Sequence, residues 1–275
     1  MGAIGKIKNI IEWCEWFSAS MKCDRAERLS LGKAQIEPIH VVMNGPTLKD
    51  SIHLINEIPG KVLMVNSAIS HLEDFNSIKP NYYCLADPAY IDPNAALADL
   101  VVNTWESINQ YNGPLELFVP NLWKNKFLIN KSNIHVRYVI SVPAPKGKHL
   151  YEKLQKNTGA PAFQGVVVMG LYVALQLGYK KIYLHGAEQK RDNIFVNERN
   201  ELYIRDVHLY KEKKTIKNLT LRSGIHMLDE YHAEVNLFEN LYLLRDYSAI
   251  CGAKIINVST DSLIDCFERY YKRDL

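Results

Sequence analysis

The first polar residues with the spacing of a ligand-binding turn follow directly after the apolar run His40–Met43. They are Asn44, Gly45, Pro46 and Thr47. A glycine lets a ligand approach the backbone closely, and a threonine can cap the helix that follows. Backbone amides exposed at the start of that helix could hold a phosphate group. Because the segment matches neither a Walker loop nor a G-x-G-x-x-G turn, an ordinary turn with a helix cap is an equal alternative.

Two further polar positions follow the next two apolar runs. Asn66 ends the run Val62–Asn66, and Asp87 follows the run Tyr82–Ala86. Parallel strands end at one edge of a sheet, and ligands bind at the carboxyl ends of such strands, so we expect these residues to converge with Asn44. Each of them alone is also an ordinary turn residue.

An acidic residue follows a later apolar run. Gln164 and Gly165 open a predicted helix that leads into the run Lys181–His185, and Gly186 and Glu188 come next. An acid at the carboxyl end of a strand often holds ribose hydroxyls in nucleotide-binding folds. A glutamate in a solvated loop is the simpler alternative.

The elements that must position these residues alternate along the chain. Short apolar, β-branched runs are typical of parallel strands buried on both faces, and the longer segments between them carry apolar residues at helical spacing. The predicted strands are His40–Met43, Val62–Asn66, Tyr82–Ala86, Leu115–Val119, Ile134–Ile140, Lys181–His185 and Lys254–Val258, and the predicted helices are Asn94–Tyr111, Gln164–Leu177 and His226–Tyr247. This alternation predicts a three-layer, Rossmann-like α/β fold, with a mostly parallel sheet and helices on both faces.

An amphipathic helix is predicted at the N-terminus, between Gly5 and Met21, because apolar residues recur there at spacings of three and four. Those residues are Ile7, Ile10, Ile11, Cys14 and Phe17, with Trp13 and Trp16 beside them. We expect this helix to pack on the domain or on a second subunit. The two tryptophans, near Lys6, Lys8 and Lys22, would also suit a membrane interface.

Composition excludes several classes of protein. With 275 residues, 47% hydrophobic and 23% charged, the chain is an ordinary globular protein and not a disordered or coiled-coil one. A net charge of +3 is too small to indicate nucleic-acid binding. The five cysteines form no C-x-x-C pair, so neither a zinc knuckle nor a disulfide framework is indicated. No apolar run is long enough for a signal peptide or a membrane span, and we expect a cytoplasmic protein.

Taken together, these motifs resemble a known family. The turn Asn44 to Lys49, then Asn66, then the block from Gly165 through Gly178-Tyr179-Lys180 to Gly186, resembles the bacterial sialyltransferases of glycosyltransferase family 42. It is also similar to the related flagellar-accessory and pterin-diphosphokinase-like families. The match covers, in order and rough spacing, most of the chain after about residue 38.

The resemblance implies an inverting, metal-independent transferase of bacterial surface polysaccharide, lipopolysaccharide or glycoconjugate synthesis. Its substrates would be a CMP-linked sugar, sialic-acid-like or Kdo-like, and a glycan acceptor, with no other cofactor. It implies residues 38–275 as the nucleotide-sugar-binding catalytic domain. Residues 1–37 precede the match, and from their apolar spacing we expect them to be a helical extension, which could contact the inner membrane. A homo-oligomer is compatible with the resemblance. The long polar stretch Glu188–Asn218 would form a lid, as long functional loops often do.

The resemblance also implies roles for individual residues. Asn44 and Thr47, with Gly45 between them, would lie on the phosphate side of the nucleotide, and Asn66 would contact the donor. Glu188, after Gly186, stands where the family has an aspartate near the nucleotide.

This sequence departs from the family pattern at several of the positions. Asp87 stands where the sialyltransferases have an asparagine, and Phe163-Gln164-Gly165 replaces a threonine-serine-glycine nucleotide contact. Tyr203 and Tyr210 are the available substitutes for the paired tyrosines that stabilise the departing phosphate. Arg205 or Lys190 could balance its charge.

Glycosyl transfer needs a base that takes the proton of the acceptor hydroxyl, and histidine suits that role. Among nine histidines we expect His208, which lies in the polar stretch, to be the base, with His226 as the second candidate and His232 as a rival. Two alternatives stay open. One is a pterin-type diphosphokinase that needs Mg²⁺ and ATP, although the chain has no D-x-D metal motif. The other is a non-catalytic accessory protein with the same fold.

Overall fold

The computed structural model describes most of the chain. The described residues are 3–21, 29, 31–70, 77–91, 98–124, 126, 129, 131–147, 149–189, 194–205, 219–221 and 223–270. Among them, no helix is both long and apolar enough to cross a membrane.

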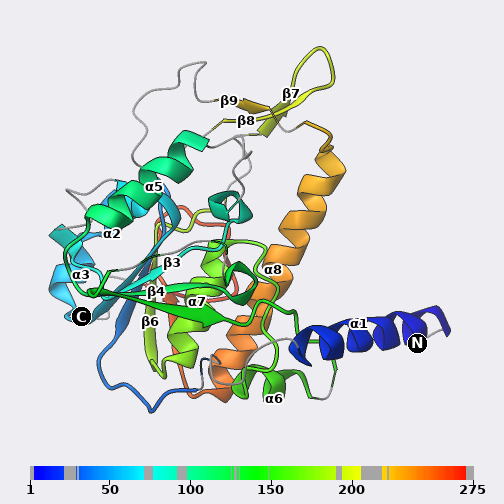
Figure 1. Cartoon of the computed structure of the whole chain (residues 1–275), viewed down its shortest axis with the longest axis horizontal. Helices are drawn as coiled ribbons and strands as arrows, with labels where there is room; N and C mark the ends of the chain where they lie inside the picture. Colours follow the sequence, from blue (N-terminus) through cyan, green and yellow to red (C-terminus); the bar gives the residue numbers. More distant parts are fainter. Residues whose placement is uncertain are drawn as a thin grey trace.

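The centre of the molecule is an eight-stranded sheet in which every pair of neighbouring strands is parallel (Figure 1). Its strands are β1 (Ile39–Val42), β2 (Lys61–Val65), β3 (Tyr82–Cys84), β4 (Leu115–Pro120), β5 (Ile134–Val139), β6 (Lys181–His185), β10 (Lys254–Asn257) and β11 (Glu268–Arg269). The seven predicted strands are confirmed to within two residues. The two-residue strand β11 is too short to leave a sequence pattern.

The strand order is β11-β10-β6-β1-β2-β3-β4-β5, and the side on which successive strands are added to the sheet changes between β1 and β6. From β1 the chain adds strands on one side out to β5, and from β6 it adds strands on the other side. β1 and β6 are themselves paired, with Ile39 opposite Ile182 and Val42 opposite His185. In open parallel sheets this switch point is where ligands bind, at the carboxyl ends of the strands.

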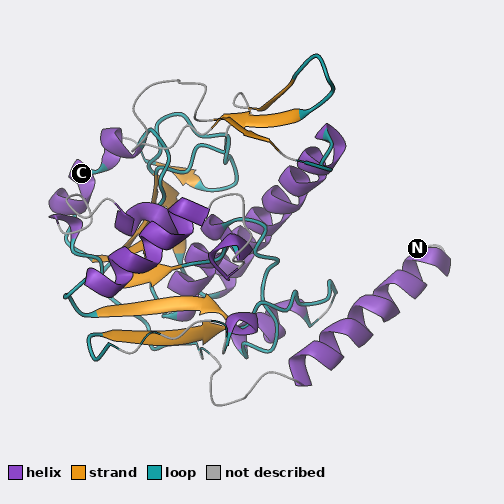
Figure 2. Ribbon diagram, turned by 45° about the horizontal axis from the view of Figure 1, so that its top comes forward, coloured by secondary structure: helices purple, strands orange, loops and turns teal. Residues whose placement is uncertain are grey.

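Helices cover both faces of the sheet, which confirms the predicted three-layer α/β class (Figure 2). On one face, α7 (Val166–Gln176) and α8 (Met227–Ile250) pack on Val41 and Leu63. On the other, α2 (Leu48–Ser51) and α5 (Ala98–Gln110) pack on Val42 and Met64. Alternate residues of β1 and β2 therefore serve opposite layers, as parallel strands buried on both faces require. The remaining helical segments are α3 (His53–Glu57), α6 (Leu150–Gln155), η2 (Asn66–Ser70), η3 (Pro88–Ile91) and η4 (Asn121–Trp123).

The segment after β6 differs from the expected polar loop. Within Glu188–Asn218 and just beyond it lies a small antiparallel sheet, with β7 (Ile194–Val196), β8 (Leu202–Arg205) and β9 (Leu219–Leu221) in the order β7-β8-β9. The rings of Phe195 and Tyr203, directly opposite each other in the pairing, stack with their centroids 5.7 Å apart. Cross-strand aromatic pairs stabilise such ribbons, and the strands are too short for the alternation to stand out in the sequence.

The N-terminal helix α1 (Ala3–Met21) confirms the predicted amphipathic helix and projects from the body at one edge (Figure 2). Trp16 attaches it to the domain. The indole nitrogen of Trp16 donates a 2.7 Å hydrogen bond to the carbonyl of Thr158, and the ammonium of Lys153 lies 4.8 Å from the centre of its ring.

Candidate functional site

The backbone segments that leave β1 and β6 are bonded together beyond the ends of the strands. The amide of Met43 donates to the carbonyl of His185, and the amide of Gly45 donates to the carbonyl of Gly186, each at 3.0 Å. Gly186 has a φ of +59°, which favours glycine, and a Cβ there would lie 2.9 Å from the carbonyl oxygen of Met43. The two segments can therefore approach closely only because Gly186 has no side chain.

Gly45 makes room for a buried carboxylate. A Cβ on Gly45 would overlap both Glu188 Oε2 and the carbonyl oxygen of Gly186. Glu188 is only 7% exposed, so the alternative of a solvated loop glutamate is wrong. A group does approach the backbone closely at Gly45, but it is a side chain of the same molecule, and approach of a ligand there stays a prediction.

The carboxylate of Glu188 bonds to Thr47. Glu188 Oε1 accepts a 2.7 Å hydrogen bond from the backbone amide of Thr47 and a second one from the Thr47 hydroxyl. Thr47 makes no side-chain cap to α2, so the predicted helix cap is wrong, because the hydroxyl is engaged by Glu188. The amide that the sequence offered to a phosphate is likewise occupied by a carboxylate.

Asn44 supplies a buried amide at the same edge. It is 7% exposed, and its Nδ2 lies 3.3 Å from Ser67 Oγ and 3.4 Å from the carbonyl oxygen of Val65. Those two residues flank Asn66, so the structure brings Asn44 and Asn66 together as predicted. Ser67 was not singled out in the sequence, although its place directly after the second strand was a usable signal.

The oxygens of these two asparagine side chains are buried acceptors. Among the described residues, neither Asn44 Oδ1 nor Asn66 Oδ1 has a hydrogen-bond partner. Asn66 has a φ of +49°, a conformation that asparagine tolerates better than most residues, and the hydroxyl of Tyr83 donates to its carbonyl oxygen. A buried acceptor without a donor costs about 1–3 kcal/mol, so these oxygens are positioned to accept hydrogen bonds from a ligand.

Asp87 and the start of α7 make contacts of their own. The exposed Asp87 accepts a 2.9 Å hydrogen bond from the amide of Ala89, and so forms a turn that begins η3. Gln164 is exposed, and Gly165 precedes α7 in extended conformation. A Cβ on Gly165 would make an ordinary 3.4 Å contact with Leu237 of α8.

The residues predicted for the leaving group and the base are only partly described. Tyr203 lies on β8, where its hydroxyl is 3.4 Å from Glu201 Oε2, and Arg205 is the last residue of that strand. His208, Tyr210 and Lys190 lie outside the described residues.

The second base candidate, His226, is exposed and directly precedes α8, where its backbone amide donates to Asp229 Oδ2 at 2.9 Å. At a rise of 1.5 Å per residue, His226 lies about 16 Å along α8 from Leu237, the residue of α8 nearest to Gly165. The rival His232 is an exposed residue of the same helix.

A buried chain of hydrogen bonds, missed in the sequence, ties α2 to β6. His40 Nε2 lies 2.8 Å from the carbonyl oxygen of Ile58, His40 Nδ1 lies 2.9 Å from His185 Nε2, and His185 Nδ1 lies 3.1 Å from the hydroxyl of Ser51. The carbonyl of Ile58 can only accept, and each neutral imidazole ring has one donor and one acceptor nitrogen. All three hydrogen bonds therefore run the same way: Ser51 donates to His185, His185 to His40, and His40 to Ile58. Burial lowers the pKa of both histidines, and for His185 the neighbouring His40 lowers it further.

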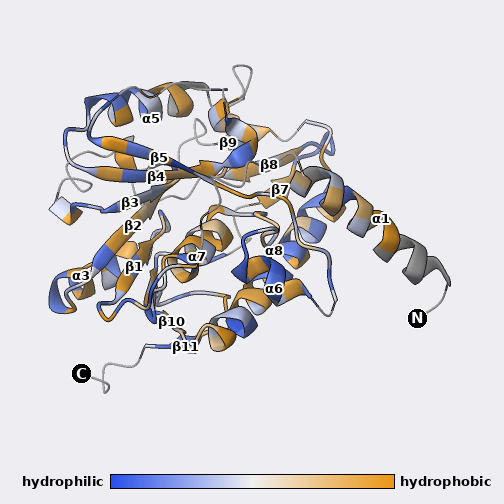
Figure 3. Ribbon diagram, turned by 60° about the horizontal axis from the view of Figure 1, so that its bottom comes forward, coloured by the Kyte–Doolittle hydropathy of each residue, from blue (hydrophilic) through white to orange (hydrophobic). Residues whose placement is uncertain are grey.

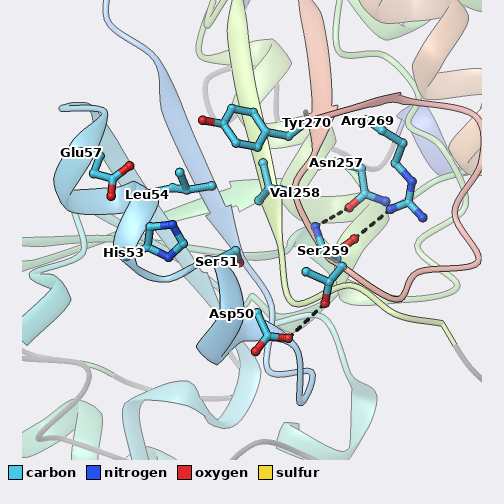
Figure 4. A pocket seen from close by; sticks show the side chains of 11 residues that line it. Asp50, Ser51, His53, Leu54, Glu57, Asn257, Val258, Ser259, Arg269 and Tyr270 are labelled. Atoms are coloured by element: carbon cyan, nitrogen blue, oxygen red, sulfur yellow. Dashed lines mark hydrogen bonds between the residues drawn. The ribbon is translucent and has the colours of Figure 1, made fainter. Parts of the chain in front are cut away.

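A separate cavity of about 490 Å³ opens beside α2 and α3 (Figure 4). Its walls include Asp50, Ser51 and His53 on one side and Ser259 and Arg269 on the other. None of Asn44, Asn66 and Glu188 lines it. Within the described part of the chain, no three His, Cys, Asp or Glu side chains are grouped as metal ligands would be.

The comparisons with known proteins gave matches among solved structures alone. No family model and no curated protein sequence matches the chain. The sialyltransferase CstII from Campylobacter jejuni is similar in its complex with cytidine-5'-monophosphate, at 16% identity and a TM-score of 0.42, over 86% of this chain and 85% of that one. Its complex with CMP-3FNeuAc gives 15% identity and a TM-score of 0.44, over 85% and 86%. The apo alpha-2,3-sialyltransferase from Campylobacter jejuni gives 15% and 0.41, over 88% and 83%.

Proposed function

We propose that this chain is an inverting glycosyltransferase that transfers a sugar from a CMP-linked donor to a hydroxyl of a glycan acceptor. The observation that carries the proposal is the pair of buried acceptors Asn44 Oδ1 and Asn66 Oδ1 beside the buried carboxylate of Glu188, at the switch point of the sheet. All three groups accept hydrogen bonds. They suit a ligand rich in hydroxyl and amino groups, such as a nucleoside joined to a sugar.

The residues that form this cluster are also those that carry the sequence resemblance to bacterial sialyltransferases. Asn44, Gly45, Thr47 and Asn66 come from the two turns of the resemblance, and Glu188 comes from its helix-to-strand block. A sialic-acid-like or Kdo-like donor, used in bacterial surface polysaccharide or glycoconjugate synthesis, fits that resemblance best.

In the proposed reaction, a base takes the proton of the acceptor hydroxyl, and the freed oxygen attacks the anomeric carbon from the face opposite the nucleotide. The bond from that carbon to the phosphate oxygen breaks, and CMP leaves with the electron pair. His208 is the proposed base, with His226 as the second candidate. Arg205, with Tyr203 and Tyr210, would balance the charge on the departing phosphate. Because the leaving group carries a single phosphate, we propose that the reaction needs no metal ion.

The test is release of CMP from CMP-sialic acid and CMP-Kdo, measured by chromatography with a glycan acceptor and with EDTA present. We expect CMP to form in EDTA, and the product to have the inverted anomeric configuration by NMR. The variant Asn44→Ala should lose most of this activity, whereas Asn56→Ala, an exposed residue of α3, should keep it. Formation of AMP from ATP and a hydroxymethyl-pterin, only with Mg²⁺, would establish the diphosphokinase instead. No turnover of any donor would point to the accessory protein.

A further inference from the structure

The N-terminal helix α1 carries several large apolar side chains that are exposed. Figure 3 shows the helix standing out from the domain, with several of its residues in the colour of hydrophobic ones. The exposed fractions are 62% for Ile10, 52% for Ile11, 49% for Trp13, 48% for Phe17 and 68% for Met21. Scattered exposed apolar residues are common on soluble proteins, but a contiguous set on one helix marks a contact surface. With the described part of the chain in place, each of these side chains keeps about half of its surface or more in water.

The spacing of these exposed side chains fits a partner helix. Ile10, Cys14, Phe17 and Met21 follow one another at intervals of four, three and four residues, and all four are exposed. This is the a/d spacing of a helix that packs lengthwise against another helix. The rings of Trp13 and Phe17 stack with centroids 5.5 Å apart, so Trp13 extends the apolar surface beside the stripe.

The attachment of α1 to the domain leaves the stripe free. Trp16, with its hydrogen bond to Thr158 and its contact with Lys153, lies on a different side of the helix from Ile10 and Phe17. Ser20, one turn later on the same side as Trp16, is 8% exposed. The helix is therefore held by its inward side, while its apolar stripe points away from the domain.

The charge of α1 argues against a membrane as the partner of the stripe. In its sequence, two lysines, Lys6 and Lys8, are balanced by two glutamates, Glu12 and Glu15, so the helix carries no net charge. Helices that lie in a membrane interface usually have a polar face rich in lysine and arginine, which anionic lipids attract.

The area of the stripe is sufficient for pairing with an identical helix. On this side of the helix, the side chains of Ile10, Trp13, Phe17 and Met21, each about half exposed or more, leave on the order of 500 Å² of apolar surface in water. Two copies of this face together would bury about 1,000 Å², the lower limit for a specific interface.

We propose that α1 is a homodimerisation element, in which the Ile10–Cys14–Phe17–Met21 stripe of one copy packs lengthwise on the same stripe of a second copy. Cys14 lies within the stripe, so either orientation of the two helices places the two Cys14 side chains within about 10 Å of each other, given interhelical distances of 8–10 Å and a rise of 1.5 Å per residue.

The test is sedimentation of the full chain over a range of concentrations, with matched variants. We expect a monomer–dimer equilibrium for the wild type. Phe17→Glu should raise the dimer dissociation constant roughly a hundredfold or more, because two carboxylates would be buried without partners. The control Leu263→Glu changes an apolar side chain of similar exposure, 55%, outside α1 and should leave the constant unchanged. Circular dichroism confirms that both variants are folded.

A flexible bismaleimide supplies a second readout, the proximity of the two Cys14 thiols in the dimer. It should cross-link the wild type into a covalent dimer, and Cys14→Ser should abolish that product. A wild type that stays monomeric at every concentration would overturn the proposal, and so would a dimer that Phe17→Glu leaves intact. Binding of the monomer to anionic vesicles, lost in Phe17→Glu, would assign the stripe to a membrane instead.

Discussion

Glu188 Oε1 accepts a 2.7 Å hydrogen bond from the backbone amide of Thr47, which joins the segment after β6 to the segment after β1 across the switch point. The contact places a carboxylate at the position where a helix start would otherwise attract a phosphate. A phosphate at that amide would have to displace Glu188. We therefore expect Glu188 to bind the hydroxyl groups of the nucleoside and the phosphate to bind elsewhere at this edge.

The first prediction distinguishes two roles for Glu188, binding the hydroxyl groups of the nucleoside or blocking a phosphate site. The change Glu188→Gln keeps the shape of the side chain but replaces a charged acceptor with a neutral one, which weakens a hydrogen bond by about 1 kcal/mol. We expect calorimetry to show roughly fivefold weaker binding of both cytidine and CMP. If Glu188 instead blocks a phosphate site, CMP alone would bind more tightly to the variant, while cytidine would not.

The second prediction concerns Gly45. In Gly45→Ala, the new methyl group would overlap Glu188 Oε2 and the carbonyl of Gly186, so the two segments must separate. We expect the free energy of unfolding, measured by urea denaturation, to fall by about 2–4 kcal/mol, as for other overpacked sites without room to relax. The control Gly165→Ala introduces only an ordinary contact, and it should change stability by less than about 1 kcal/mol. Equal effects of the two substitutions would contradict the close packing described at Gly45.

The third prediction follows from the buried histidine pair. The pKa values of His40 and His185 are lowered in the folded protein from the ordinary 6.5, so the unfolded chain binds more protons than the folded one just below that pH. Stability should therefore be full above pH 6.5 and decline as the pH falls from 6.5 towards the lowered values. Two such groups give a slope of at most about 2.7 kcal/mol per pH unit.

Urea denaturation across this pH range measures the slope directly, and His185→Gln provides the comparison. The variant lacks one of the two titrating rings, so its free energy of unfolding should depend less steeply on pH than that of the wild type. The same slope in both proteins would show that this pair does not titrate on unfolding.

The fourth prediction concerns the base. We expect His208→Ala to lower kcat for sugar transfer by roughly 10²- to 10⁴-fold, the usual contribution of a general base, while CMP affinity stays nearly unchanged. His226→Ala is the comparison, because His226 is an exposed residue at the start of α8. Near-normal turnover in His208→Ala, with a large loss in His226→Ala, would transfer the role to His226.

Much of the fold could be predicted from local patterns. The buried strands and the helices α5, α7 and α8 are long enough, and regular enough, for their apolar periodicity to show in the sequence. The small sheet β7-β8-β9 was missed because its strands have only three or four residues each and lie within a long, mostly polar stretch, so their apolar residues form no visible period. The two-residue strand β11 depends wholly on its pairing with β10.

The candidate site was predictable in outline only. Asn44, Asn66 and Glu188 follow predicted strands, and the rule that parallel strands end at one edge was sufficient to group them. The bond from Glu188 to Thr47 depends on how the strands are ordered across the switch point, and no local pattern encodes that order. The chain from Ser51 to His40 was missed for the same reason, since it joins residues far apart in the sequence.

The most direct test of the central claim is a thermal-shift screen of the full chain with CMP, CDP, UDP, GDP, ADP and ATP, each with Mg²⁺ and with EDTA. A ligand that binds only the folded state raises the unfolding temperature by mass action. We expect an increase with CMP that persists in EDTA and is lost in Asn44→Ala. An increase with ATP alone, and only with Mg²⁺, would contradict the claim.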